Sequence, residues 1–86
     1  MTDEKILFEP DWLSPPGDTI GDLLEERGWS QTEFAQRISY TTKHVNQLIR
    51  GKAPISQETA LRLERVLGST ARFWLQREAE YRETLA

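Results

Sequence analysis

Residues 30–51 read SQTEFAQRISYTTKHVNQLIRG, and this stretch predicts two short helices separated by a tight break. Ser30 and Glu33 have the S-x-x-E spacing of a capping box, in which the hydroxyl and the carboxylate each accept a backbone N–H at the start of a helix. The first helix of the pair therefore begins after Ser30 and runs to about Ile38. It is barely two turns long.

The second helix of the pair carries a row of polar side chains. It follows a break at residues 39–41, is capped by Thr41 or Thr42, and ends at Gly51. Its polar residues recur at i, i+3, i+4 and i+7, so they share the face opposite the apolar one. The members of this polar stripe are Lys43, Asn46, Gln47 and Arg50.

The segment that holds the polar stripe is basic although the protein is acidic. The 86 residues carry 11 Lys and Arg against 14 Asp and Glu, a net charge of −3. Residues 34–57 contain four of the cations and no acid, whereas residues 1–33 contain two cations and nine acids, a net −7. Salt screening confines an electric field to roughly 8–10 Å. One face of this acidic protein can therefore still bind phosphate.

Two short helices with a solvent-facing row of Lys, Asn, Gln and Arg on the second are typical of a helix-turn-helix that binds in the DNA major groove. Lys can reach the acceptors of guanine, and Asn and Gln can pair with adenine. Residues at helix N-termini are placed for phosphate. The alternative is a merely solvated helix face, but such faces usually carry charges of both signs. The candidate DNA-binding residues are Gln31, Thr41, Thr42, Lys43, His44, Asn46, Gln47, Arg50 and Lys52.

The flanking segments predict three more helices and an arm. The prolines of residues 1–15 predict an extended N-terminal arm, and residues 16–86 form one all-α domain. Trp74, Tyr81 and Leu85 lie on one side of the last helix, and we expect them to form a dimer interface, with the core of this chain as the alternative for Trp74. The first of these helices lies between Pro16 and Gly28, and the second lies between Ser56 and Gly68. The last begins at Ser69 or Thr70 and runs toward the chain end.

Composition argues against an enzyme. A domain of this size has little room for a deep catalytic cleft, and the chain has no cysteine and one histidine, so we expect no metal and no cofactor. We also expect no membrane contact, no small-molecule substrate and a cytoplasmic location, because neither a membrane span nor a signal peptide is evident. Asp18, Asp22, Glu25 and Glu26 could be taken for a carboxylate active site, but the first two are better explained as first-turn charges of a helix.

The chain resembles a known family of regulators. Residues 30–38, 42–48 and 51–52 are similar to the XRE class of helix-turn-helix proteins, the lineage of lambda-type phage repressors. Further segments resemble HigA-type antitoxins of bacterial toxin–antitoxin operons, and the most specific of them is residues 67–75, LGSTARFWL. The resemblance covers roughly residues 15–82. The other segments that carry it are residues 16–18, 25–28, 51–55 and 59–63.

This resemblance implies a five-helix lambda-repressor-like domain that binds its own operator as a dimer, represses that operon and neutralises a small toxin that is an mRNA nuclease. Because such nucleases are usually basic, the acidic half of the chain is the expected toxin-facing surface. The residues expected to bind the toxin are Asp18, Asp22, Glu25 and Glu26. An equal alternative is that these acids keep the protein soluble and steer DNA to its basic face.

The chain departs from the family pattern in two places. The arm at residues 1–15 is longer and more apolar than is usual, and a similar arm precedes the helix-turn-helix in some longer proteins with a metallopeptidase-like domain. The chain could therefore be a stand-alone XRE-type regulator, or the DNA-binding domain of such a protein, without a toxin. It could also be a protein-interaction module that uses the fold as a scaffold. Ser39 and Tyr40 stand in the turn where many relatives have glycine.

Overall fold

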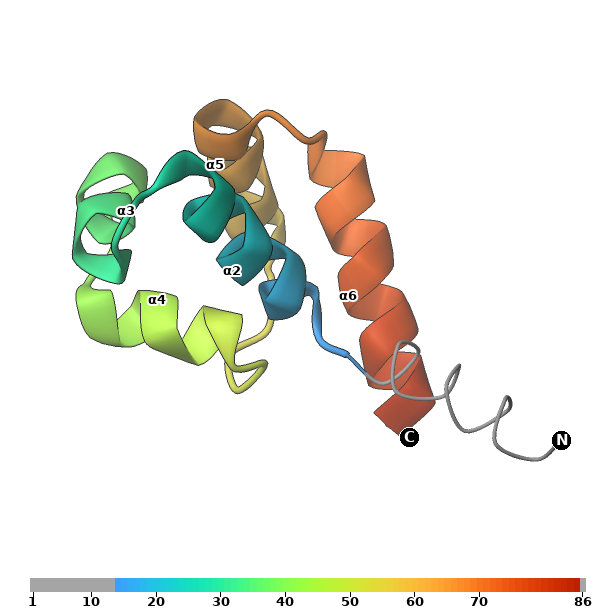
Figure 1. Cartoon of the computed structure of the whole chain (residues 1–86). Coiled ribbons are helices and arrows are strands. Elements are labelled where there is room, and N and C mark those ends of the chain that lie inside the picture. The colour runs from blue at the N-terminus through green and yellow to red at the C-terminus, as the bar shows by residue number, and fades with distance from the viewer. Residues whose placement is uncertain (1–13, 86) are drawn as a thin grey trace, which may run out of the picture.

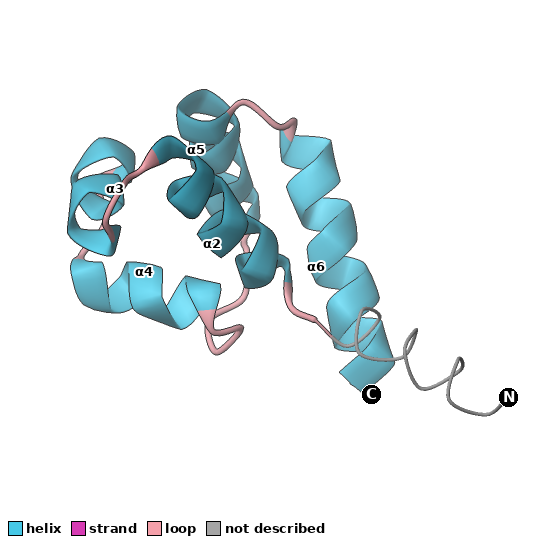
Figure 2. Ribbon diagram, viewed as in Figure 1, coloured by secondary structure: helices cyan, strands magenta, loops and turns pink. Residues whose placement is uncertain are grey.

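Five helices make up the part of the chain that the structure, a computed structural model, describes, which is residues 14–85 (Figure 1). No strand occurs in this part, which confirms the predicted all-α class, as Figure 2 shows. The arm predicted for residues 1–15 lies almost entirely outside the described residues. None of the described helices is long and apolar enough to cross a membrane. The helices are α2 (Pro16–Arg27), α3 (Gln31–Ile38), α4 (Thr42–Ile49), α5 (Gln57–Leu67) and α6 (Ala71–Leu85).

Side-chain hydroxyls fix where four of the helices begin. In each case the hydroxyl oxygen accepts the backbone N–H three residues later, which satisfies a donor that the first turn cannot satisfy itself. Thr41 rather than Thr42 caps α4. The four bonds are Ser30 to Glu33 at 3.1 Å, Thr41 to His44 at 3.0 Å, Ser56 to Thr59 at 3.2 Å and Thr70 to Phe73 at 3.1 Å.

The capping box predicted at the start of α3 forms only in part. The Ser30 hydroxyl accepts as expected, but the Glu33 carboxylate accepts from the guanidinium of Arg37 at 3.0 Å. These two side chains lie four residues apart on α3, where an exposed ion pair forms easily. The carboxylate therefore stabilises the outer face of α3 instead of the backbone before it.

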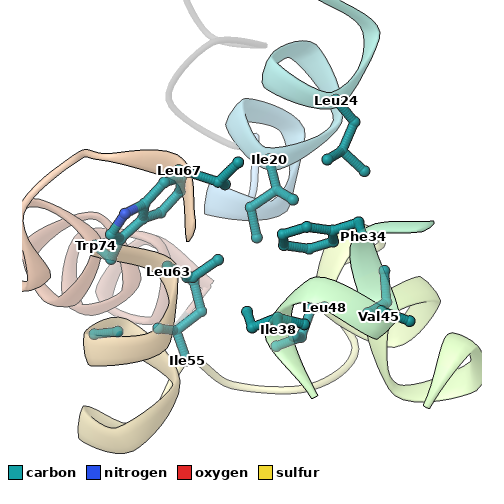
Figure 3. Packing of buried hydrophobic residues seen from close by; sticks show 12 residues of the cluster. Ile20, Leu24, Phe34, Ile38, Val45, Leu48, Ile55, Leu63, Leu67 and Trp74 are labelled. Atoms are coloured by element: carbon teal, nitrogen blue, oxygen red, sulfur yellow. The ribbon is translucent and has the colours of Figure 1, made fainter. Parts of the chain in front are cut away.

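A single apolar core joins all five helices (Figure 3). Helix α2 contacts α4 and α6, and α5 contacts α3 and α6, so α2 lies between the α3–α4 pair and α6 (Figure 1). The largest fully buried side chains are Trp74 of α6 and Phe34 of α3. Burying a large apolar side chain stabilises a fold by roughly 1.5–3 kcal/mol. The other core residues are Ile20, Leu24, Ala35, Ile38, Val45, Leu48, Ile55, Ala60, Leu63 and Leu67.

The burial of Trp74 corrects the predicted dimer interface. Its side chain has 0% exposure and packs within the core of this chain, so it has no surface that could contact a partner. Tyr81 is half-buried and Leu85 is 54% exposed. Aromatic residues spaced along one side of a helix can face either their own core or another chain, and for Trp74 the core of its own chain accounts for the burial.

Gly17 lets α2 come very close to the end of α4. A Cβ at this position would lie far inside van der Waals distance of the carbonyl oxygens of Leu48 and Ile49. Both oxygens belong to the backbone, so no flexible side chain can move aside. This close approach determines where the C-terminal end of α4 lies relative to α2.

We predict that Gly17→Ala destabilises the fold by roughly 1–3 kcal/mol, because the added methyl group overpacks a backbone contact. Alanine is the better helix former by up to ~1 kcal/mol, so helix propensity alone predicts the opposite sign. The midpoint of urea unfolding, followed by far-UV circular dichroism, measures the change.

Gly21→Ala is the matched control on the same helix. A Cβ there would meet only Cγ2 of Ile49, at 3.8 Å, which is an ordinary contact. This substitution should keep or raise stability, by up to ~1 kcal/mol from helix propensity. Equal effects of the two substitutions would contradict the assignment of the close approach to Gly17.

Candidate nucleic-acid interface

The polar stripe lies on the face of α4 that points away from the core. Val45 and Leu48 on the inner face have 0% and 1% exposure. At the two ends of the stripe, Lys43 and Arg50 are exposed, whereas Asn46 and Gln47 in the middle are half-buried. The long cationic side chains therefore reach furthest from the protein, and the two amides lie closer to its surface.

Two of the candidate residues contact each other. The side-chain amide of Asn46 donates from Nδ2 to Oε1 of Gln31, at 3.3 Å. This bond joins the middle of α4 to the first residue of α3. Because the Gln31 oxygen is engaged, its NH₂ group remains as an outward donor, and Asn46 keeps its own oxygen as an acceptor. The arrangement offers both kinds of hydrogen-bonding group beside the stripe.

The N-terminal end of α4 can bind an anion. The hydroxyl oxygen of Thr41 accepts from the backbone of His44, which leaves the hydroxyl hydrogen free to donate. Thr41, Thr42 and Lys43 are all exposed. First-turn N–H groups and the positive end of the helix dipole favour phosphate here. The His44 ring is half-buried and packs edge-on against Tyr40, with 4.7 Å between ring centroids, so packing restrains it.

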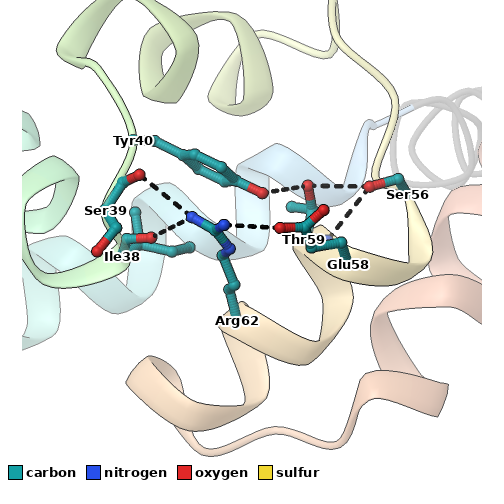
Figure 4. Close-up of polar contacts among 7 residues, drawn as sticks. All are labelled: Ile38, Ser39, Tyr40, Ser56, Glu58, Thr59 and Arg62. Carbon is teal, nitrogen blue, oxygen red and sulfur yellow. Dashed lines mark hydrogen bonds and ion pairs between the residues drawn. The ribbon is translucent and has the colours of Figure 1, made fainter.

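Helix α5 holds the turn between α3 and α4 from behind (Figure 4). Ser39 occupies the left-handed region at φ 66, which few residues other than glycine adopt. Arg62 donates from Nη1 to the carbonyl oxygens of Ile38 and Ser39, at 3.1 and 3.2 Å. Its Nη2 donates to Glu58 at 2.6 Å. A charged donor at the end of α3 satisfies carbonyl groups that the helix leaves unpaired.

Tyr40 adds a second link between the turn and α5. Its hydroxyl lies 2.8 Å from Oγ1 of Thr59, and the guanidinium of Arg62 lies 4.6 Å from the centre of its ring. Thr59 is 4% exposed and also hydrogen-bonds to Ser56 (Figure 4). Tyr40 and Arg62 position the turn, and the sequence did not reveal this, because no spacing rule connects positions so far apart along the chain.

The loop after α4 is held by its own backbone and by α6. The backbone N–H groups of Lys52 and Ala53 both donate to the carbonyl oxygen of Gln47, at 2.9 and 3.2 Å. From α6, Nη2 of Arg82 donates to the carbonyl oxygen of Gly51 at 3.3 Å. Nε of the same arginine donates to the buried carboxylate of Glu78 at 2.5 Å. The loop that carries Lys52 is therefore fixed from two sides.

The four acids predicted to bind a toxin lie on a different helix. Asp18, Asp22, Glu25 and Glu26 are all exposed on α2, and none of them forms an ion pair within residues 14–85. The described residues also contain no cluster of three or more acids or histidines that could hold a metal ion. The acids on α2 thus form an unpaired acidic surface, separate from the polar stripe on α4.

Comparisons with known proteins give the family. The helix-turn-helix family HTH_3 matches residues 20–74. The uncharacterized HTH-type transcriptional regulator YddM of Escherichia coli (strain K12) is 37% identical over 60 residues, which cover 70% of this chain and 64% of that protein. This chain therefore spans less than two thirds of that relative.

Two solved structures share the arrangement of helices. Antitoxin HigA of Pseudomonas aeruginosa, with the higBA promoter, has a TM-score of 0.78 at 28% identity, covering 83% of this chain and 78% of that chain. An addiction module antidote protein of a HigA family from Coxiella burnetii has a TM-score of 0.75 at 29% identity, with the same coverage. The match to this family of regulators agrees with the prediction that the chain is not an enzyme. The chain thus belongs to the helix-turn-helix family HTH_3, the XRE class, with a lambda-repressor-like fold that resembles the HigA antitoxins.

Proposed function

We propose that this chain is a DNA-binding antitoxin that represses its own operon and neutralises a toxin nuclease. The observation that carries the DNA part is the α3–turn–α4 unit. Its outer face bears the polar stripe, α5 holds its turn, and α6 holds the loop after α4. A HigA antitoxin of similar fold is known with its promoter DNA, which supports operator binding by this chain.

The proposed contacts divide into base reading and phosphate binding. Lys43 and Gln47 project from the stripe toward base edges, where such side chains can discriminate between base pairs. The N-terminal end of α4 and Gln31 bind phosphate on one side of the groove. Arg50 at the end of α4 and Lys52 in the loop that α6 holds bind phosphate on the other side of the groove.

We also propose that the chain binds DNA as a homodimer. One recognition helix covers about half a site, and two copies would present their helices roughly 34 Å apart on a palindrome. The surface that supports this proposal is the outer part of α6, where Leu85 is 54% exposed and Tyr81 is half-buried. Trp74 takes no part, because the core encloses it.

The acidic surface of α2 is the proposed toxin-binding surface. Its four unpaired carboxylates complement a small basic nuclease, the class of partner that the HigA resemblance implies. The acids are Asp18, Asp22, Glu25 and Glu26.

The second candidate function is a regulator without a toxin. The observation that favours it is the relation to an HTH-type transcriptional regulator from Escherichia coli that is longer than the matched region. In that case the DNA contacts remain as proposed, and the acidic surface of α2 serves solubility and the steering of DNA to the basic face.

We predict that substitutions in the stripe separate base reading from phosphate binding. Lys43→Ala or Gln47→Ala should cost ~1–3 kcal/mol on the cognate operator and relax its sequence preference. Arg50→Ala should weaken cognate and scrambled DNA alike and reduce the slope of log affinity against log salt by about one unit per protomer. Fluorescence anisotropy at several salt concentrations measures both quantities. A wild-type salt slope for Arg50→Ala would remove Arg50 from the phosphate contacts.

The dimer is tested at the end of α6. Leu85→Asp places a charge in the proposed apolar interface, so we expect the sedimentation equilibrium to move toward the monomer and operator affinity to fall with it. Circular dichroism serves as the control that α6 still forms. A Leu85→Asp protein that remains a dimer and binds the operator with unchanged affinity would exclude this surface.

The toxin partner is tested with the product of the adjacent gene. If that gene encodes a basic nuclease, its expression alone should arrest growth, and co-expression of this chain should restore it. Changing the four acids of α2 to Asn or Gln should slow association of the two proteins and reduce its salt dependence, with operator binding unchanged. An adjacent gene of another kind would favour the regulator without a toxin. An association rate that the changes leave intact would exclude the acidic surface of α2 as the toxin-binding surface.

A further inference from the structure

A cleft of about 350 Å³ opens between the end of α3 and the outer face of α5. Three guanidinium groups and three aliphatic side chains line most of it, together with the carboxylate of Glu58. None of its lining residues comes from α4. The six side chains are Arg37, Arg62, Arg65, Ile38, Leu61 and Val66.

The cleft carries an excess of positive charge, and one of its cations is unengaged. Arg62 contacts Glu58 and the carbonyl groups of the turn (Figure 4). Arg37 contacts Glu33 and lies over the ring of Trp29. Arg65 is exposed and forms neither an ion pair nor a side-chain hydrogen bond within residues 14–85. Its guanidinium is therefore available to an incoming anion.

An exposed apolar side chain lies beside these cations. Leu61 is 45% exposed in the middle of α5 and lines the same cleft as Arg65. A single exposed leucine is ordinary on a protein surface. In this cleft, however, it lies beside Val66 and three arginines, and arginine is enriched at the centres of protein interfaces.

We propose that this cleft binds an acidic segment of a partner protein. Two carboxylates of the segment pair with Arg65 and Arg37, and an aliphatic side chain between them packs on Leu61. Arginine and carboxylate groups form paired, charge-assisted hydrogen bonds, which gives the contact direction as well as strength. This site is separate from the polar stripe and from the acidic surface of α2, so it does not depend on the proposed toxin.

The shape and lining of the cleft favour a peptide segment over other anions. The exposed rim at Leu61 and Arg65 leaves the site open, whereas small-molecule sites bury most of their ligand. DNA phosphates would use the arginines but not the aliphatic lining. Because Arg62 both lines the cleft and donates to the turn carbonyls, an occupant of the cleft lies one side chain away from the α3–α4 turn.

The test uses the full chain and a fluorescein-labelled peptide of about ten residues that alternates Glu or Asp with Leu or Ile, a length that spans the cleft when extended. The comparison peptide replaces each acid with its amide. We expect the acidic peptide to bind, with affinity that falls as salt rises, and its amide counterpart to bind at least tenfold more weakly. Amide shifts in NMR spectra of the labelled protein should cluster on α3 and α5.

Single substitutions in the protein complete the test. Arg65→Ala should weaken binding of the acidic peptide roughly tenfold, as expected for loss of a charge-assisted hydrogen bond, and Leu61→Asp should abolish it. Arg72→Ala, which removes an exposed arginine outside the cleft, should change nothing. Both cleft residues are exposed, and thermal unfolding verifies that the variants stay folded.

Four results would overturn the proposal. One is failure of the acidic peptide to bind, and another is equal binding of the acidic and amide peptides. The third is an Arg65→Ala protein that keeps its peptide affinity. The fourth is an Arg65→Ala protein that loses operator affinity, because that loss would assign the cleft to DNA phosphate. Lys43→Ala, which alters the stripe, should leave peptide binding intact and so separates the two sites.

Discussion

The guanidinium of Arg62 is the interaction on which the geometry of the helix-turn-helix depends. It donates to two carbonyl oxygens at the end of α3, pairs with Glu58 and lies over the ring of Tyr40. The turn itself contains no glycine and holds Ser39 in a left-handed conformation. Because a short turn of this kind has few bonds of its own, the angle between α3 and α4 depends on α5, and the direction of the polar stripe follows from that angle.

The other end of α4 is fixed by contacts of a different kind. Gly17 allows two backbones to approach without a side chain between them, and Arg82 bonds to the carbonyl oxygen of Gly51. Arg77 adds a bond from α6 to the carbonyl oxygen of Pro15, at 3.3 Å, just before α2. A helix of only eight residues is unstable alone in water, so packing must hold it in place. Helices α3 and α2 supply most of that packing.

Charge is distributed so that an acidic protein keeps a basic face. The unpaired acids lie on α2 and the polar stripe lies on α4. Salt screening confines the electric field of each group to roughly 8–10 Å. The cleft between α3 and α5 adds a second cationic surface within the same small domain. Two of its three arginines also stabilise the fold, because Arg62 hydrogen-bonds to the carbonyl oxygen of Ile38 and Arg37 pairs with Glu33. The side chain of Arg65 makes no hydrogen bond or ion pair among the described contacts.

The sequence by itself determined the helices, their caps and the exposed face of α4, because these depend on residues at most four positions apart. It could not determine that Trp74 belongs to the core, since an aromatic side chain on one face of a helix can pack in its own chain or on a partner. Nor could it connect Arg62 to Ile38, 24 residues away, or Arg82 to Gly51, 31 residues away. Those contacts form only once the helices have packed. The two arginines donate to backbone carbonyl groups, which every residue carries, so no local sequence pattern identifies the acceptor.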